Sequence, residues 1–131
     1  MTKEEKKNLD AVIQMERTLV DNIFNACKEN SENFEVDYTP ITFIKVVCDL
    51  AQQGIESSLE NSLQGITDKK VIKQVRNSLK LNKTMLTAIY NSCKKSAESF
   101  HVDYVPIKFL RMTCDSAFKV VETGLKQGFG N

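Results

Sequence analysis

One segment of the chain occurs twice, and this duplication constrains the fold more than any other feature. Residues 27–48 read CKENSENFEVDYTPITFIKVVC, and residues 93–114 read CKKSAESFHVDYVPIKFLRMTC, an offset of 66 positions. At this offset, 17 of the 37 positions from 23 to 59 are identical. A repeat of this length predicts one structural unit built twice. We therefore expect repeat A over about 3–65 and repeat B over about 67–128, within a single domain spanning 1–131.

Each repeat has two segments with apolar residues at helical spacing, joined by a short Asp-Tyr-X-Pro connection. The first helix is expected over about 3–32, opened by a capping box in which Thr2 and Glu5 satisfy unpaired backbone N–H groups. For the second helix, Thr39 is the expected N-cap, Pro40 the first helical residue and Gly65 the stop.

The second repeat predicts the same pair of helices. Thr67 is the expected cap of the third helix, and the fourth helix follows Pro106 and is expected to fray at Gly128-Phe129-Gly130. Four helices with short connections favour an antiparallel arrangement. The predicted fold is thus an all-α, up-down-up-down four-helix bundle built from two homologous helical hairpins.

The composition is that of a soluble globular protein. The chain has 131 residues, of which 41% are hydrophobic and 27% charged, with a net charge of +1. It contains no apolar run long enough for a transmembrane helix, and the N-terminus lacks the apolar core of a signal peptide. The compartment therefore has to be inferred from the cysteines.

The four cysteines, Cys27, Cys48, Cys93 and Cys114, fall on the inward faces of the four expected helices. Cys27 and Cys48 are symmetric about the first turn, as Cys93 and Cys114 are about the second, which favours one disulfide in each hairpin and a secreted or otherwise oxidising location. One alternative is four buried thiols in a cytoplasmic protein. The other is a metal-binding bundle in which all four cysteines are ligands, since both turns lie at one end of the bundle.

The duplicated turn is the first candidate binding surface. Tyr is favoured at protein interfaces, so two Tyr-Asp units at one end of the bundle suit a partner protein. The structural alternative is that Tyr38 packs on Phe43 of the next helix, that Phe34 closes the preceding helix, and that the Asp side chains bond to nearby backbone. The candidate residues are Asp37, Tyr38, Asp103 and Tyr104.

The middle of the bundle is the second candidate. Glu16 and Asn82 occupy equivalent positions within otherwise apolar stripes, and small residues such as Ala51 and Ala117 are expected opposite them. A charged side chain is seldom buried without a partner. This pattern suggests an alternative function, a carrier of a small apolar, lipid-like ligand between the two hairpins.

The third candidate is a basic face on the third helix. Its residues follow helical spacing opposite the apolar stripe and are Lys69, Lys73, Arg76, Lys80 and Lys83. An anionic protein or membrane surface fits this face better than nucleic acid, because no aromatic residues alternate with the charges.

Catalytic motifs are scarce. His101 is the only histidine, and the chain has no phosphate-binding glycine loop and no nucleophile elbow. The sequence thus predicts a non-catalytic interaction protein without a cofactor, which binds a partner macromolecule through the duplicated turn or the basic face.

Overall fold

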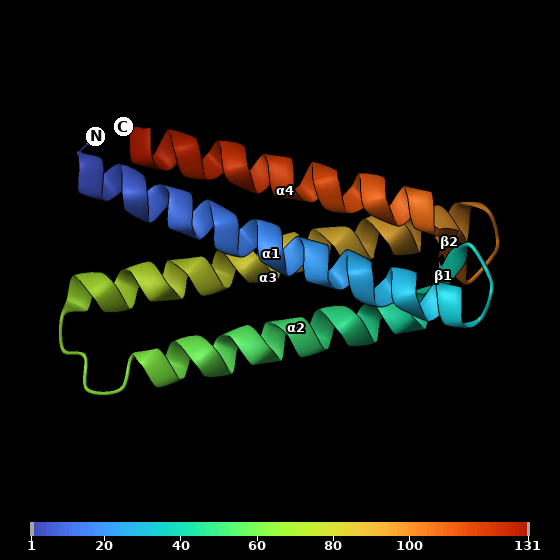
Figure 1. Ribbon diagram of the computed structural model, residues 1–131, viewed down its shortest axis with the longest axis horizontal. Helices are drawn as coiled ribbons and strands as arrows, with labels where there is room; N and C mark the ends of the chain where they lie inside the picture. Colours follow the sequence, from blue (N-terminus) through green and yellow to red (C-terminus); the bar gives the residue numbers. More distant parts are fainter. Residues whose placement is uncertain (1, 131) are drawn as a thin grey trace.

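The computed structural model describes residues 2–130, and the side chains of residues 2–128; Met1 and Asn131, at the ends of the predicted domain, lie outside the described residues. The elements in order are α1 (Lys3–Asn33), β1 (Tyr38–Pro40), α2 (Ile41–Ser62), α3 (Lys69–Ser99), β2 (Tyr104–Pro106) and α4 (Ile107–Gly130). The four helices run up, down, up and down, with both ends of the chain at the same end of the bundle (Figure 1). The predicted all-α four-helix arrangement is confirmed.

The helices form a ring in which the closest neighbours come from different hairpins. α1 packs most extensively on α4, and α2 on α3, whereas α1 and α2 of the first hairpin share less contact. The core between the four helices is apolar and is centred on fully buried side chains. They include Val20, Ile23, Ile44, Met85, Ile89 and Leu110.

The two connections are joined by a short antiparallel strand pair that the sequence analysis did not predict. Thr39 pairs with Val105 at its centre. The first N–H group of each following helix then bonds to the opposite connection: Ile41 donates to the carbonyl of Asp103, and Ile107 to that of Asp37, both at 2.8 Å. Each hairpin therefore caps a helix of the other, which fixes the two hairpins together at this end.

The expected role of Thr39 as an N-cap was wrong. Pro40 is the N-cap of α2, without a side-chain cap bond, and Thr39 lies in β1 with its side chain fully buried. The cause is the strand pair, which already satisfies the first backbone N–H of α2 and turns Thr39 toward the core. The Thr39 hydroxyl faces the weakly polar Cys27 thiol and has no stronger hydrogen-bond partner among the described residues.

Replacing Thr39 with valine is expected to raise the free energy of unfolding by about 1 kcal/mol, because a buried hydroxyl without a good partner costs more than a methyl group. Val105 already occupies the paired position and is equally buried. Denaturant unfolding checks the change, with the reverse exchange, Val105→Thr, as the matched control that should destabilise. A stability loss in Thr39→Val would contradict this account of the strand pair.

The other helix ends agree with the sequence in part. Thr2 accepts from the Glu5 N–H at 3.0 Å, as predicted. α2 ends at Ser62, three residues before the expected stop at Gly65. Gly65 lies in the connection to α3 and adopts a left-handed conformation with φ of 80°. Asp68, not Thr67, caps α3 by accepting from Lys70 N–H at 2.9 Å. α4 continues to Gly130, through the three residues at which fraying is expected.

Candidate functional site

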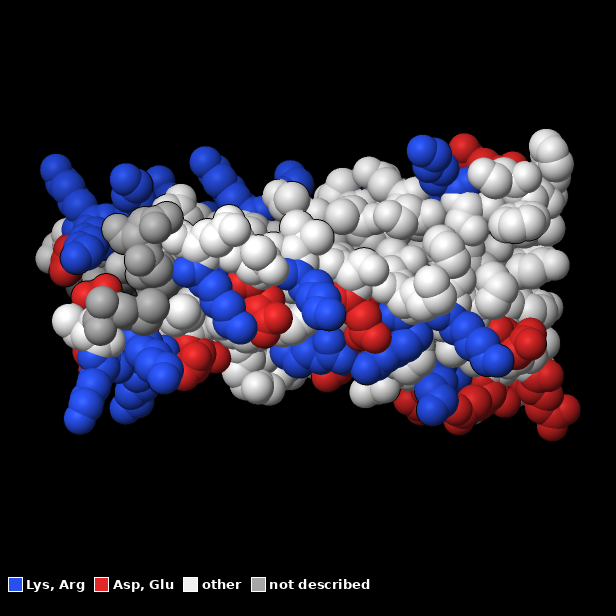
Figure 2. Space-filling view, turned by 90° about the horizontal axis from the view of Figure 1, so that it is seen from above, with Lys and Arg blue, Asp and Glu red and all other residues white. Residues whose placement is uncertain are grey.

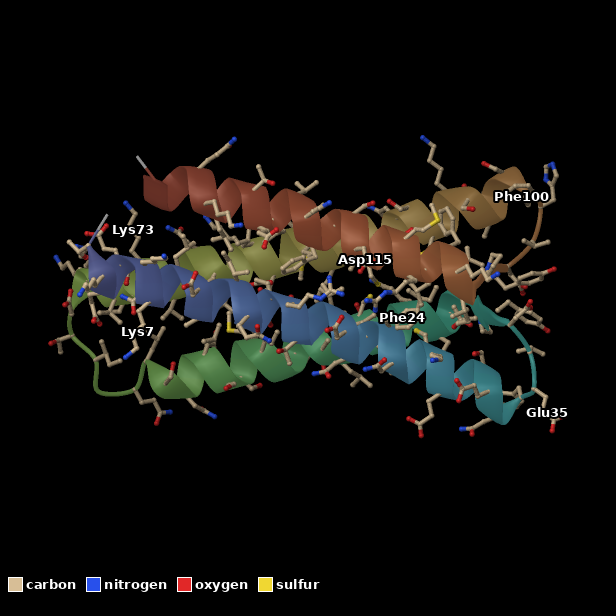
Figure 3. All side chains as sticks on the ribbon, turned by 45° about the horizontal axis from the view of Figure 1, so that its top comes forward. Lys7, Phe24, Glu35, Lys73, Phe100 and Asp115 are labelled. Atoms are coloured by element: carbon tan, nitrogen blue, oxygen red, sulfur yellow. The ribbon has the colours of Figure 1, made fainter. Side chains whose placement is uncertain are left out.

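Two phenylalanines project from the end of the bundle where the strands pair. Phe34 is 71% exposed and Phe100 is 75% exposed, and each is the C-cap residue of its helix. The structural alternative for the turn expected Phe34 to close the end of its helix; Phe34 is at that end, but its side chain is exposed to solvent. Figure 3 shows Phe100 and Glu35 at this same end of the molecule.

The backbone of the turn explains why these side chains point outward. The residues that follow the two phenylalanines, Glu35 and His101, are left-handed, with φ of 55° and 58°. The next residue in each turn bonds back into its helix, Val36 N–H to the Ser31 carbonyl and Val102 N–H to the Ala97 carbonyl, both at 3.0 Å. This Schellman arrangement reverses the chain within two residues, so the half-buried valine covers the helix end and the phenylalanine is left outside.

The two predicted tyrosines meet across the strand pair. The rings of Tyr38 and Tyr104 lie 4.4 Å apart between centroids, at an angle of 37°. The Asp37 and Asp103 side chains are exposed, while their backbone carbonyls make the inter-hairpin caps. We call this the turn-end surface: the side chains of Phe34, Tyr38, Phe100 and Tyr104, with Asp37 and Asp103 beside them.

The four cysteines form one layer of the core, but neither predicted disulfide is present. Cys27, Cys48, Cys93 and Cys114 are all free and buried. The disulfide prediction rested on the symmetric positions of the cysteines about each turn, which place all four in the core but do not by themselves pair them. The oxidising location stays a prediction.

Burial keeps the thiols protonated at neutral pH. It raises the pKa of Cys27 to about 11 and those of Cys48 and Cys93 to about 12. The pKa of Cys114 is also raised, by burial and then by its three neighbouring thiols. Across the part of the chain that the structure describes, no group of three or more Cys, His, Asp and Glu side chains is placed to hold a metal ion. All four cysteines are buried in the apolar core, where they pack as small core residues.

Glu16 and Asn82 contact each other in the centre of the bundle, and both are fully buried. With its amide nitrogen turned toward Glu16, Asn82 donates to Oε2 at 2.6 Å and also contacts Oε1. Loss of hydration raises the pKa of Glu16 to about 7. The amide suits both forms of the acid, since its nitrogen can donate to a carboxylate and its oxygen can accept from a neutral carboxyl group.

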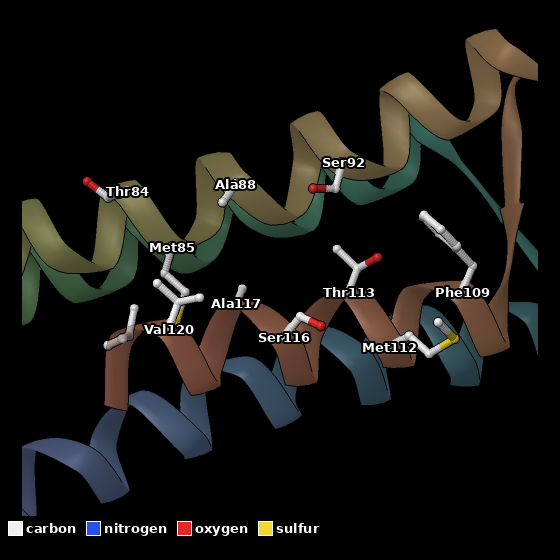
Figure 4. A pocket seen from close by; sticks show the side chains of 11 residues that line it. Thr84, Met85, Ala88, Ser92, Phe109, Met112, Thr113, Ser116, Ala117 and Val120 are labelled. Carbon is white, nitrogen blue, oxygen red and sulfur yellow. The ribbon is translucent and has the colours of Figure 1, made fainter. Parts of the chain in front are cut away.

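The other two residues expected to line a ligand cavity lie elsewhere. Ala51 is half-buried against the core, and Ala117 lies on an open groove of about 460 Å³ between α3 and α4. Figure 4 shows this groove. Its walls are small hydroxyl residues and apolar side chains, and the apolar ones include Phe109, Met112 and Val120. The structure therefore does not bring Glu16, Asn82, Ala51 and Ala117 to a common cavity.

The basic face of α3 is exposed along its whole length, from Lys69 to Lys83. None of its five residues makes an ion pair with any of the described residues. Figure 3 places Lys73 at the end of the bundle opposite Phe100. Over the face seen in Figure 2, many Lys and Arg side chains lie near the chain ends, and a band of Lys, Arg, Asp and Glu runs the length of the molecule beside a largely uncharged area.

Sequence analysis missed an ion-pair network that joins α1 to α4. Arg17 lies 3.1 Å from Asp21 and 3.2 Å from Asp115, and Arg111 lies 3.7 Å and 3.3 Å from the same two carboxylates. The guanidinium of Arg111 also lies 4.9 Å from the centre of the Phe24 ring. Arg17–Asp21 and Arg111–Asp115 are each spaced by four residues and could be found in the sequence. The two contacts between the helices depend on which helices pack together.

Among the described residues, none of the helices combines the length and apolar character that a membrane crossing requires.

Comparison with known proteins adds no identification. Searches of protein-family models, of curated proteins and of solved structures find no match to this chain.

Proposed function

We propose that this protein is a non-catalytic interaction module that binds a partner protein through the turn-end surface. The observation that carries the proposal is the pair of phenylalanines, 71% and 75% exposed at equivalent sequence positions of the same end. Exposed apolar residues that gather at one place mark interaction sites, whereas single exposed apolar residues are common on protein surfaces. Aromatic residues are also the side chains that most often dominate the energy of protein interfaces.

The rigidity of this end supports the same proposal. The strand pair, the two inter-hairpin caps and the contact between the two tyrosine rings hold the turns in place. A surface that is already ordered loses little conformational entropy when a partner binds. The two phenylalanines are thus presented at a fixed spacing, which suits a partner with two apolar pockets.

Charge around the turn-end surface indicates the polarity of the partner. The first turn and the helix end before it carry Glu29, Glu32, Glu35 and Asp37 against Lys28. The second turn is not acidic, because Lys94, Lys95 and Lys108 stand there beside Glu98 and Asp103. A complementary partner would therefore place basic side chains around the pocket for Phe34, since charges at the rim of an interface guide association and exclude wrong partners.

Replacing Phe34 and Phe100 together with serine is expected to weaken partner binding about tenfold or more, because both lost contacts lie at the proposed centre of the interface. Photo-cross-linking residues placed at 34 and 100 identify the bound partner from the source cells, and titration of the purified partner measures its affinity. The folded state should stay intact, since neither side chain is in the core.

Val120→Ser is the matched control, because Val120 is 73% exposed and lies on the α3–α4 groove away from the turn-end surface. It should leave partner binding unchanged. Equal cross-linking from position 120, or full binding by the double variant, would sink the proposal.

A further inference from the structure

The α2–α3 contact contains an incomplete counterpart of the ion-pair network on α1 and α4. At the offset of 66, Lys45 and Asp49 correspond to Arg111 and Asp115, and Lys83 corresponds to Arg17. Lys45 pairs with Asp49 at 3.2 Å and lies 5.1 Å from the centre of the Tyr90 ring. These contacts match those of Arg111 with Asp115 and Phe24.

One carboxylate is missing from this counterpart. Where α1 supplies Asp21, α3 supplies Thr87. The α1–α4 network has two arginines and two aspartates and is neutral, but Lys45, Lys83 and Asp49 leave one positive charge uncompensated. Lys83 makes no ion pair with the residues that the structure describes.

A hollow of about 220 Å³ lies at this place, lined by side chains that include Lys45, Gln52, Lys83, Thr87 and Asn91. Its volume is several times the roughly 30 Å³ share of one water molecule. The lysines, the threonine hydroxyl and the asparagine amide can all donate hydrogen bonds. Asp49 also lines the hollow, but its carboxylate is paired with Lys45.

We propose that this hollow binds a phosphate group, which takes the place of the carboxylate that Asp21 supplies in the other network. Gln52 favours phosphate over a fully deprotonated anion such as sulfate. Its Oε1 atom is buried and has no hydrogen-bond partner among the described residues, and a hydrogen phosphate carries an O–H that can donate to it. The adjoining hollow, lined by Lys80, Lys83, Thr84 and Thr87, places a further positive charge beside the site.

Calorimetric titration of the intact protein with inorganic phosphate, at constant ionic strength, tests the site. We expect saturable binding of one phosphate, with sulfate at least about tenfold weaker. Glycerol phosphate is titrated separately: equal affinity supports a site for the phosphate group alone, and tighter binding supports a phosphorylated small ligand. Absence of saturable phosphate binding overturns the proposal, and equal binding of sulfate overturns the assignment to phosphate.

Thr87→Asp is the decisive variant, because it adds the carboxylate that the α1–α4 network has. It should weaken phosphate binding about tenfold or more and raise the unfolding temperature in phosphate-free buffer. Lys83→Met should weaken phosphate binding without this stabilisation. Thr18→Asp is the matched control, since it makes the same charge change at an exposed site on α1. If Thr18→Asp loses as much phosphate binding as Thr87→Asp, or if Thr87→Asp loses none, the proposal is overturned. This proposal does not depend on the one made for the turn-end surface.

Discussion

Replacing Asn82 with aspartate is expected to lower the free energy of unfolding by about 4 kcal/mol at pH 8 and by far less at pH 4.5. Asparagine and aspartate have nearly the same shape, so the exchange leaves no cavity. It removes the amide that bonds to Glu16 and puts a second carboxyl group against the first at a fully buried position. Two carboxylates in contact cannot both be ionised there without a large cost, and one proton has to be retained.

Denaturant unfolding at the two pH values measures this effect. Asn77→Asp is the matched control, because it makes the same exchange on the exposed side of the same helix. The control should change stability by no more than about 0.5 kcal/mol. If Asn82→Asp were as mild as Asn77→Asp at pH 8, Glu16 and Asn82 could not be in contact in the core.

The second large effect concerns the pH dependence of the unaltered protein. The pKa of Glu16 is raised from its ordinary value of 4.5 to about 7 in the folded state, because burial disfavours the carboxylate. Between these values the folded state binds more protons than the unfolded state, so stability falls as pH rises. The contribution of Glu16 is fully present below pH 4.5 and is lost by about pH 7, a change of about 3 kcal/mol.

Glu16→Gln isolates this contribution, since glutamine keeps the size and the hydrogen-bonding capacity of the side chain but does not titrate. The difference in unfolding free energy between the two proteins, measured from pH 4 to pH 8, should shift in favour of the variant across the window from 4.5 to 7. Other titrating groups cancel in this difference. A difference that stayed constant with pH would show that Glu16 is solvated in the folded state.

The helices and their arrangement followed from local pattern. Apolar spacing, the Thr2 capping box and the short connections were enough to predict four antiparallel helices, and these are the helices observed. The strand pair was not predicted, because each strand has only three residues and exists only through its partner in the other hairpin. For the same reason Thr39 was mistaken for a cap, although the sequence Thr-Pro before an apolar helix is typical of one.

The candidate surfaces were predicted in part. The apolar pattern of the helices marked Glu16 and Asn82 as unusual. It could not show that the two side chains contact each other, because this contact depends on how α1 and α3 face the bundle axis. The turn was marked by its tyrosines, while the most exposed aromatic residues there are Phe34 and Phe100. Their orientation follows from the left-handed backbone of Glu35 and His101. A glycine at these two positions would have signalled such a turn in the sequence, but neither residue is glycine.

By itself, the sequence determined the number, order and approximate limits of the helices, because these depend on contacts between residues three or four positions apart. Only the tertiary structure decided which helices lie closest. It also placed the four cysteines in one core layer, where they are unpaired. It also completed an ion network between α1 and α4 and left its counterpart between α2 and α3 one carboxylate short, since charges distant in sequence interact only where packing brings their helices together.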